Sequence, residues 1–506
     1  MTDRRTRARE VRREAADLAF DLPPAKHTTN GEEVEYGRPI ANYSKGLPHD
    51  AAGIVTPAAY SALRKALSSG DPDDFEAIPL GTPGGRKLTN PQSGLAFDLE
   101  GPDAQAVTLA PAPRIDSAQS SAELGELYWM ALLRDVRFRD YGTDPDVAAA
   151  VADLNTSFSD FRGPRDGGVV TPGTLFRGTC PGDLVGPYVS QFLVKDVQFG
   201  SFRYHQRQQT VAPGLNFLTT FADWLNAQNG GPFVPEVVST APAAARYIRN
   251  LRDLTHYVHV DALYEAYLNA CLILLDLKAP FDPANPYQTS TNQEGFGTWG
   301  PPHILSLVTE VATRALKAVW YQKWFVHRRL RPEELGGRLE AERLGLDAFP
   351  MIDGEFLASG ALAASQAANG GVSLLPSAFP EGCPTHPAYG SGHATVAGAC
   401  VTVLKAFFDE SWVIPNPQEP DASGTALVAY TGPDAGAMTV GGELNKVASN
   451  IGMARNAAGV HWRTDYDEAV RLGEAIAIQV LREQEGTYNE PSGLTISTFD
   501  GKGVEI

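Results

Sequence analysis

The chain has 506 residues, 43% hydrophobic and 20% charged, a composition that can bury a large core and excludes a disordered or fibrous protein. Its formal net charge of -18 makes a nucleic-acid groove or an anionic membrane surface a poor partner and favours an enzyme acting on small molecules. The four cysteines, Cys180, Cys271, Cys383 and Cys400, form no CxxC pair, so we expect reduced, mostly buried thiols and no disulfide framework or zinc knuckle.

Residues 1–120 are predicted to form an extended N-terminal arm and loops packed on a larger body. Short polar runs alternate with Pro and Gly, as in LPPAKHTTNGEEVEYGRPIANYSKGLPHD, so we expect little regular core there. Residues 1–20 contain two Arg pairs but no apolar stretch resembling a signal-peptide core, and no later segment has about 18 uninterrupted apolar residues. We therefore expect neither export nor a membrane-spanning segment, with a cytoplasmic location as the default.

Residues 121–506 are predicted to form one α-helical catalytic domain. SAELGELYWMALLRDV follows a Ser cap, AAARYIRNLRDLTHYVHVDALYEAYLNACLILLDL predicts one or two long buried helices, and HILSLVTEVATRALKAVWYQKWFVHRRL predicts a third, which Arg331-Pro332 should end. After a loop region near 333–390, GHATVAGACVTVLKAFF starts a helix, and residues 443–484 predict a helix, a Gly-containing turn and a final helix. Without alternating strands and helices, the fold class is mainly α, helical bundles with little β.

Lys323 and Arg331, at the end of the third helical run, are candidate cations for binding an oxyanion. Lys supplies a point charge and Arg a planar fork of donors, a combination that suits a tetrahedral oxyanion. The alternative is a solvated basic helix end, with Arg328 and Arg329 as further surface charge.

The segment PTHPAYGSGHA, residues 384–394, predicts a rigid turn that leads into a helix. Main-chain N–H groups at the helix start, the Ser391 hydroxyl and the close backbone approach that Gly392 permits would form an oxyanion site. His393 stands where it could exchange a proton with the anion. The alternative is a plain helix cap with two bystander histidines, His386 and His393.

Arg455, His461 and Asp465 form a third cluster. An imidazole that binds a metal needs its other ring nitrogen hydrogen-bonded, and Asp465, four residues after His461, is a plausible orienter. The alternative is that His461 merely packs in the turn, while Thr464 caps the last helix with Asp467 in a capping box.

In this order and approximate spacing, the three clusters resemble the signature of the vanadium-dependent haloperoxidase family. WYQKWFVHRRLRPE, PTHPAYGSGHA and ARNAAGVHWRTD are similar to its algal bromoperoxidase branch, and NPQSGLAFDLEGPD, ELYWMALLRDV and GDLVGPYVSQFL extend the resemblance over most of the chain from about residue 30. Two positions depart from the family pattern. Gly390 replaces the usual Pro before Ser-Gly-His, which loosens the turn, and Ala454 stands where many members have Ser.

The resemblance implies an enzyme that oxidises a halide with hydrogen peroxide to a hypohalous equivalent, which then halogenates a small organic acceptor. It implies a vanadate site in the 320–470 region, with His461 as the direct vanadium ligand. The residues that would hydrogen-bond the vanadate oxygens are Lys323, Arg331, Ser391, Gly392 and Arg455.

Further roles are implied for the remaining site residues. His393 would be the general acid–base, Lys323 would polarise bound peroxide, and Asp465 would orient His461. His386 lies where the chloroperoxidase branch has an aromatic residue, which favours bromide or iodide over chloride. Because His393 and His461 both need a neutral ring nitrogen, we expect activity to fall on the acid side. Family members form homo-oligomers, so the resemblance also implies a homo-oligomer.

Two other functions fit parts of this pattern. Acid phosphatases that form a phosphohistidine have a similar signature, and vanadate mimics phosphate, so a phosphohydrolase using the same oxyanion pocket is the main alternative. A non-catalytic assembly or binding protein that kept the pocket is the other, suggested by the long Pro/Gly-rich arm.

Two further segments are given an ordinary structural interpretation. His256 and His259 lie three residues apart on one helix face with no evident acidic or Cys partners, so we take them as core or interface residues. The loop from Gln288 to Glu294 offers carbonyl oxygens to a possible calcium ion but lacks a dense carboxylate set, so an ordinary loop is favoured.

Overall fold

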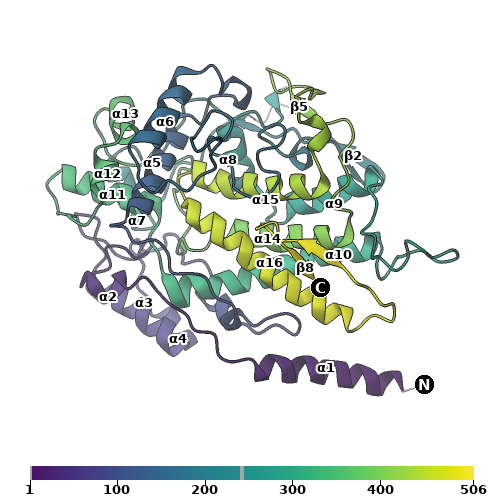
Figure 1. Ribbon diagram of the computed structural model, residues 1–506. Coiled ribbons are helices and arrows are strands. Elements are labelled where there is room, and N and C mark those ends of the chain that lie inside the picture. Colours follow the sequence, from purple (N-terminus) through teal and green to yellow (C-terminus); the bar gives the residue numbers. More distant parts are fainter. Residues whose placement is uncertain (1–2, 240–243) are drawn as a thin grey trace.

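The computed structural model describes residues 3–239 and 244–506, and its regular structure is mostly helical (Figure 1). The first six helices are α1 (Arg4–Asp21), α2 (Glu32–Glu35), α3 (Pro57–Ser69), α4 (Pro72–Glu76), α5 (Ala118–Leu132) and α6 (Pro145–Thr156). The next five are α7 (Phe221–Gln228), α8 (Leu251–Val260), α9 (Glu265–Asp276), α10 (Pro301–Tyr321) and α11 (Pro332–Arg343). The last five are α12 (Gly354–Leu357), α13 (Gly360–Ala368), α14 (Gly392–Phe407), α15 (Val440–Ala457) and α16 (Arg463–Glu485).

The described strands are short and pair only as antiparallel ribbons. They are β1 (Val197–Phe199) with β2 (Phe202–Tyr204), β3 (Thr210–Val211) with β4 (Val238–Ser239), β5 (Gln418–Pro420) with β6 (Leu427–Ala429), and β7 (Thr495–Ser497) with β8 (Gly503–Glu505). The predicted fold class, mainly α with little β, is confirmed.

Helix α14 lies at the centre of the bundle, packed against α10, α15 and α16 (Figure 1). One glycine on each helix allows α14 and α16 to approach closely, because a Cβ atom at Gly398 of α14 would collide with the Val470 carbonyl and one at Gly473 of α16 with the Thr395 carbonyl. This tight contact fixes the start of α14 relative to the start of α16, where two of the predicted motifs lie.

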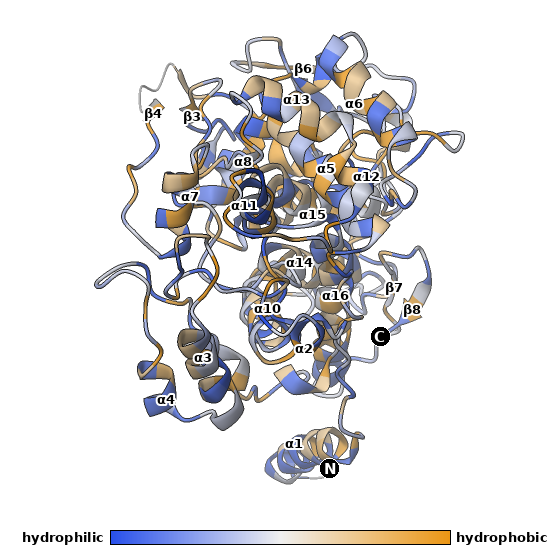
Figure 2. Cartoon of the chain, turned by 90° about the vertical axis from the view of Figure 1, so that its left-hand side faces the viewer, coloured by the Kyte–Doolittle hydropathy of each residue, from blue (hydrophilic) through white to orange (hydrophobic). Residues whose placement is uncertain are grey.

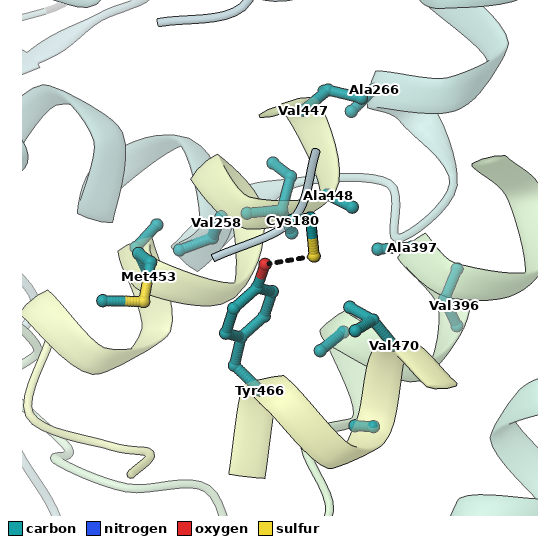
Figure 3. Close-up of a cluster of buried hydrophobic side chains, with 14 of the residues drawn as sticks. Cys180, Val258, Ala266, Val396, Ala397, Val447, Ala448, Met453, Tyr466 and Val470 are labelled. Atoms are coloured by element: carbon teal, nitrogen blue, oxygen red, sulfur yellow. Dashed lines mark hydrogen bonds between the residues drawn. The ribbon is translucent and has the colours of Figure 1, made fainter. Parts of the chain in front are cut away.

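Figure 3 shows part of the surrounding core, where apolar side chains of α8, α14, α15 and α16 meet. The Sγ atom of Cys180 lies 3.6 Å from the hydroxyl of Tyr466 within this cluster. All four cysteines are free and buried, which confirms the prediction of unpaired core thiols.

The N-terminal segment is more regular than the sequence suggested. Helix α1 has no buried residue and extends away from the body of the protein (Figures 1 and 2). Helices α3 and α4, by contrast, contribute to a separate hydrophobic cluster that includes Tyr43, Leu63 and Trp324. The expectation of little regular core in residues 1–120 is therefore wrong for this part, and the cluster supports the turn that carries Lys323. The domain division at residue 120 stays a prediction.

Helix ends also differ from the predicted ones. Helix α10 ends at Tyr321 and continues as a π-helical turn, η6 (Gln322–His327), a distortion that is frequent at functional sites. Pro332 begins α11, because a proline at the first helical position loses no hydrogen bond there. The region 333–390, predicted as a loop, contains α11, α12 and α13.

The long apolar run before residue 277 forms two helices, α8 and α9. Within the described ranges no single helix has the length and apolar composition to cross a membrane. Helices α8 and α9 reach that length and composition only when they are taken together, and the angle between them is 102°.

Candidate functional site

The helical bundle brings the predicted site residues together from distant segments. By element, they are Lys323 in η6, Arg331 at the N-cap of α11, His386 before α14, Ser391, Gly392 and His393 at the start of α14, Arg455 in the last turn of α15, His461 in the following turn, and Asp465 in the first turn of α16.

The guanidinium of Arg331 joins the motif before α14 to the turn before α16. Its Nη1 donates to the Val460 carbonyl at 2.6 Å and lies 2.9 Å from Nε2 of His461. Its Nε and Nη2 donate to the His386 carbonyl at 3.0 and 2.8 Å, and Nη2 lies 2.9 Å from Nδ1 of His386. Arg331 and Lys323 are both 0% exposed, so the alternative of a solvated basic helix end is wrong.

Main-chain carbonyl oxygens also hold Lys323 and Arg455. Nζ of Lys323 donates to the carbonyls of Pro387 and Ala388 at 2.9 and 2.8 Å. Nη1 of Arg455 donates to the Val258 carbonyl at 2.8 Å, while its Nε is buried without a hydrogen-bond partner. Carbonyl groups position these cations but leave their charge uncompensated.

The three buried cations create an excess of positive charge. Within the described part of the chain, none of them forms an ion pair with a carboxylate. Burial and the neighbouring Arg331 lower the pKa of Lys323 well below its ordinary value. Burial lowers the pKa of Arg455 to about 10, and Arg331 contributes to that shift. An anion at this place would stabilise all three charged forms.

Asp465 fixes the orientation and tautomer of His461. Its Oδ2 lies 2.8 Å from Nδ1 of His461 and accepts from the Trp462 main-chain N–H at 3.1 Å, while Oδ1 accepts from Nη1 of Arg329 at 3.0 Å. Burial and the charges of Arg331 and Lys323 lower the pKa of His461 well below its ordinary value. The ring is therefore neutral, with its proton on Nδ1 and a lone pair on Nε2, the form that binds a metal centre.

The capping alternative for this turn is wrong. Asp465, three residues after Trp462, accepts from the N-cap N–H, so it both caps α16 and orients His461. Thr464 instead donates its hydroxyl to Glu123.

His393 has a carboxylate partner that the sequence analysis did not identify. Its Nε2 lies 3.1 Å from Oδ1 of Asp261, the residue that follows α8. Burial lowers the pKa of His393 below its ordinary value, and the Asp261 carboxylate opposes part of this shift. With Nε2–H donating to Asp261, the lone pair of Nδ1 is left to accept a proton.

The start of α14 offers hydrogen-bond donors to an anion. Oγ of Ser391 accepts from the Ala394 N–H at 3.4 Å, which leaves the hydroxyl proton to donate elsewhere. The Ser391 main-chain N–H is occupied by the Asp465 carbonyl at 2.9 Å, whereas the N–H of Gly392, in the first helical turn, has no intrahelical acceptor. The donors that remain free are therefore the Ser391 hydroxyl and the N–H of Gly392.

A cavity of about 240 Å³ lies at the centre of these groups. Its lining includes His386, Gly392, His393, Arg455 and His461, together with Trp320. Lys323, Arg331 and Ser391 lie outside this lining. Arg331 contacts the lining residues His386 and His461, whereas Lys323 contacts the carbonyls of Pro387 and Ala388. The imidazoles of His386 and His461, the N–H of Gly392 and the guanidinium of Arg455 fit a tetrahedral oxyanion such as vanadate. Two carboxylates, Asp261 and Glu381, also line the cavity and are paired with His393 and His259.

The sequence and fold of this chain are similar to those of known proteins. Residues 356–490 match the family model for the VCPO second helical-bundle domain. A vanadium-dependent bromoperoxidase from Corallina pilulifera is 39% identical, in an alignment that covers 98% of this chain and 97% of the relative. A vanadium-dependent bromoperoxidase from Ascophyllum nodosum is 37% identical, in an alignment that covers 92% of this chain and 86% of the relative. The homohexameric structure of the second vanadate-dependent bromoperoxidase from Ascophyllum nodosum is 33% identical and superposes with a TM-score of 0.94, covering 100% of this chain and 90% of that one.

The helical fold and these matches over nearly the full chain identify an enzyme of the haloperoxidase type. The chain belongs to the vanadium-dependent bromoperoxidase family.

Proposed function

We propose that this chain uses hydrogen peroxide to oxidise a halide at a vanadate bound in the 240 Å³ cavity, and releases a hypohalous equivalent that halogenates small organic acceptors. The observation that supports this most directly is the convergence of Lys323, Arg331 and Arg455, none of which is ion-paired with a carboxylate among the described residues, around a neutral His461. Nε2 of His461 carries the ring's lone pair and accepts from Nη1 of Arg331 at 2.9 Å. This arrangement suits an oxyanion whose central atom accepts one nitrogen ligand.

In this proposal each site residue has one task. Nε2 of His461 would bond vanadium, and the oxygens would be held by Lys323, Arg331, Ser391, Gly392 and Arg455. Vanadate, when bound, would supply a Lewis acid that activates peroxide toward attack by halide. His393 would take a proton at Nδ1 and return it, with Asp261 fixing the ring, and the Lys323 charge would polarise bound peroxide.

The halide and the assembly are further parts of the proposal. His386 packs against Trp320, with ring centroids 4.7 Å apart, on the cavity wall. By the resemblance to the bromoperoxidase branch, this histidine favours bromide or iodide over chloride. The homohexameric relative supports a homo-oligomer for this chain as well. A calcium ion in the loop from Gln288 to Glu294 stays a prediction from the sequence.

The first test is halogenation of monochlorodimedone by the purified protein with hydrogen peroxide and bromide. We expect bromination only after orthovanadate is added, because the proposed reaction needs the bound oxyanion. A phosphatase assay without peroxide serves as the comparison. If only phosphate-ester hydrolysis is found, the cavity is that of a phosphohydrolase and the proposed function is wrong.

The acid limit of the reaction is expected to follow His393. Activity should fall as the pH is lowered through the pKa of this residue, because a protonated Nδ1 cannot accept a proton. Burial holds this pKa below its ordinary value, so the fall should lie below about pH 6.5. The measurement is the initial bromination rate against pH at saturating vanadate.

An Asp261→Asn variant provides the matched comparison for this pH profile. The Asp261 carboxylate raises the pKa of His393, so its loss should move the acid limb to lower pH. An acid limb that stays in place in this variant would argue against His393 as the titrating base.

A further inference from the structure

A second group of possible ligands lies beside the oxyanion cavity. His256 and His259, one turn apart on α8, each place Nδ1 at 3.1 Å from Oε1 of Glu236, which precedes β4. The three donor atoms lie within 4.8 Å of one another. The expectation that the two histidines have no acidic partner is therefore wrong, because Glu236 contacts both of them and Glu381 contacts His259.

Glu381 orients His259 through the ring nitrogen that lies away from Glu236. Oε1 of Glu381 lies 2.8 Å from Nε2 of His259 and Oε1 of Glu236 lies 3.1 Å from Nδ1, so both carboxylates stabilise the protonated ring. A bound ion would displace the proton on Nδ1, while Nε2–H would go on donating to Glu381. The ring is also stacked on Phe379, with centroids 3.9 Å apart and planes 9° apart. A carboxylate on the far nitrogen of a histidine commonly orients it toward a bound metal.

We propose that Glu236, His256 and His259 form a binding site for a divalent transition-metal ion of the Zn²⁺ type. The observed separations of 3.1 Å between donor atoms are close to the edge of about 3.3 Å of a tetrahedron with metal–nitrogen bonds of about 2.0–2.1 Å. Nitrogen and carboxylate donors are the types that Zn²⁺ prefers. The three side chains are between 5% and 16% exposed, so the ion would be held inside the protein wall.

The position of the site suggests an open fourth coordination place. His259 and Glu381 line the oxyanion cavity, while Glu236 and Glu381 line a second cavity of about 580 Å³. An ion between the two cavities would keep a position for water or a small ligand. None of the three ligands belongs to the proposed vanadate-binding set, so this inference does not depend on the proposed function.

Metal binding is tested on the full-length protein after chelator treatment and dialysis. Titration with Zn²⁺ by calorimetry should give one ion per chain, and Co²⁺ should produce visible d–d absorption that Zn²⁺ displaces. Glu381→Gln should weaken the affinity by about 10–100-fold, because it removes the orienting carboxylate. The variant carrying both His256→Gln and His259→Gln should lose this ion entirely.

A His205→Gln variant is the matched control. His205 also pairs with a carboxylate, at 2.8 Å, but that carboxylate is Asp196 and not Glu236, so its loss should leave the stoichiometry unchanged. The proposal is wrong if wild-type protein binds no ion, or if Glu236→Gln and the double variant bind Zn²⁺ as wild type does. In that case the two histidines are protonated hydrogen-bond donors to Glu236.

Two further readouts keep the result interpretable. If the double variant does not fold, as judged by circular dichroism, Glu236→Gln and the Co²⁺ spectrum of the wild type decide the question. Bromination with orthovanadate is measured in parallel, and its absence beside normal Zn²⁺ binding would contradict only the haloperoxidase proposal.

Discussion

Replacing His461 with alanine is expected to abolish vanadate-dependent bromination while leaving the protein folded. Nδ1 of His461 is held by the Asp465 carboxylate, which leaves the lone pair on Nε2 for vanadium, and removal of such a partner group alone typically costs about 10–100-fold in metal affinity. Loss of the ligand itself should cost more than this. The measurements are calorimetric titration with orthovanadate and the initial bromination rate.

The cost to stability should be modest by comparison. His461→Ala leaves Nη1 of Arg331 with its bond to Val460 and leaves Asp465 with its bonds to Arg329 and Trp462. We expect a loss of about 1–3 kcal/mol in the free energy of unfolding. His327→Ala is the matched control, because His327 is also buried, at the end of η6, yet packs against Tyr389 and has no hydrogen-bond partner on Nε2. Unchanged vanadate affinity in His461→Ala would refute its assignment as the vanadium ligand.

Asp465→Asn is expected to damage both the site and the fold. The carboxylate pairs with the buried Arg329 and accepts from Nδ1 of His461. An amide cannot neutralise the charge of Arg329, and it offers His461 a donor as well as an acceptor. An amide N–H directed at Nδ1 would shift the ring proton to Nε2, where the lone pair is needed. We expect vanadate affinity to fall by about 10–100-fold and the free energy of unfolding to fall by about 3–5 kcal/mol.

Denaturant unfolding and orthovanadate titration measure the two effects separately. Asp467→Asn provides the comparison, since Asp467 lies two residues further along α16 and has a buried Oδ1 without a hydrogen-bond partner. Its replacement should leave vanadate affinity unchanged. If Asp465→Asn binds vanadate as tightly as wild type, the orienting role of Asp465 is wrong.

The sequence predicted the helices of the core well because their apolar periodicity is a local property. The turn between α15 and α16, the helix beginning at Gly392 and the mainly α class all agree with the structure. Helix ends were less predictable. A proline can end one helix or begin the next, and only the path of the chain shows that Pro332 begins α11.

The motif residues were predictable from spacing, whereas their partners were not. Asp261 lies 132 residues before His393, and Arg329 lies 136 residues before Asp465, so no local pattern connects either pair. The same holds for Glu236 and Glu381 around His259. Such contacts depend on how α8, α14 and α16 pack, which is a property of the whole core.

The carbonyl oxygens that hold Lys323, Arg331 and Arg455 belong to Pro387, Ala388, His386, Val460 and Val258. Every residue type has a carbonyl group, so a change of side chain at most of these positions keeps the acceptor as long as the backbone keeps its path. The path of the main chain thus fixes the orientation of the three cationic side chains. Point mutations around the cavity can therefore change its shape and its halide preference while the anion-binding charges stay in place.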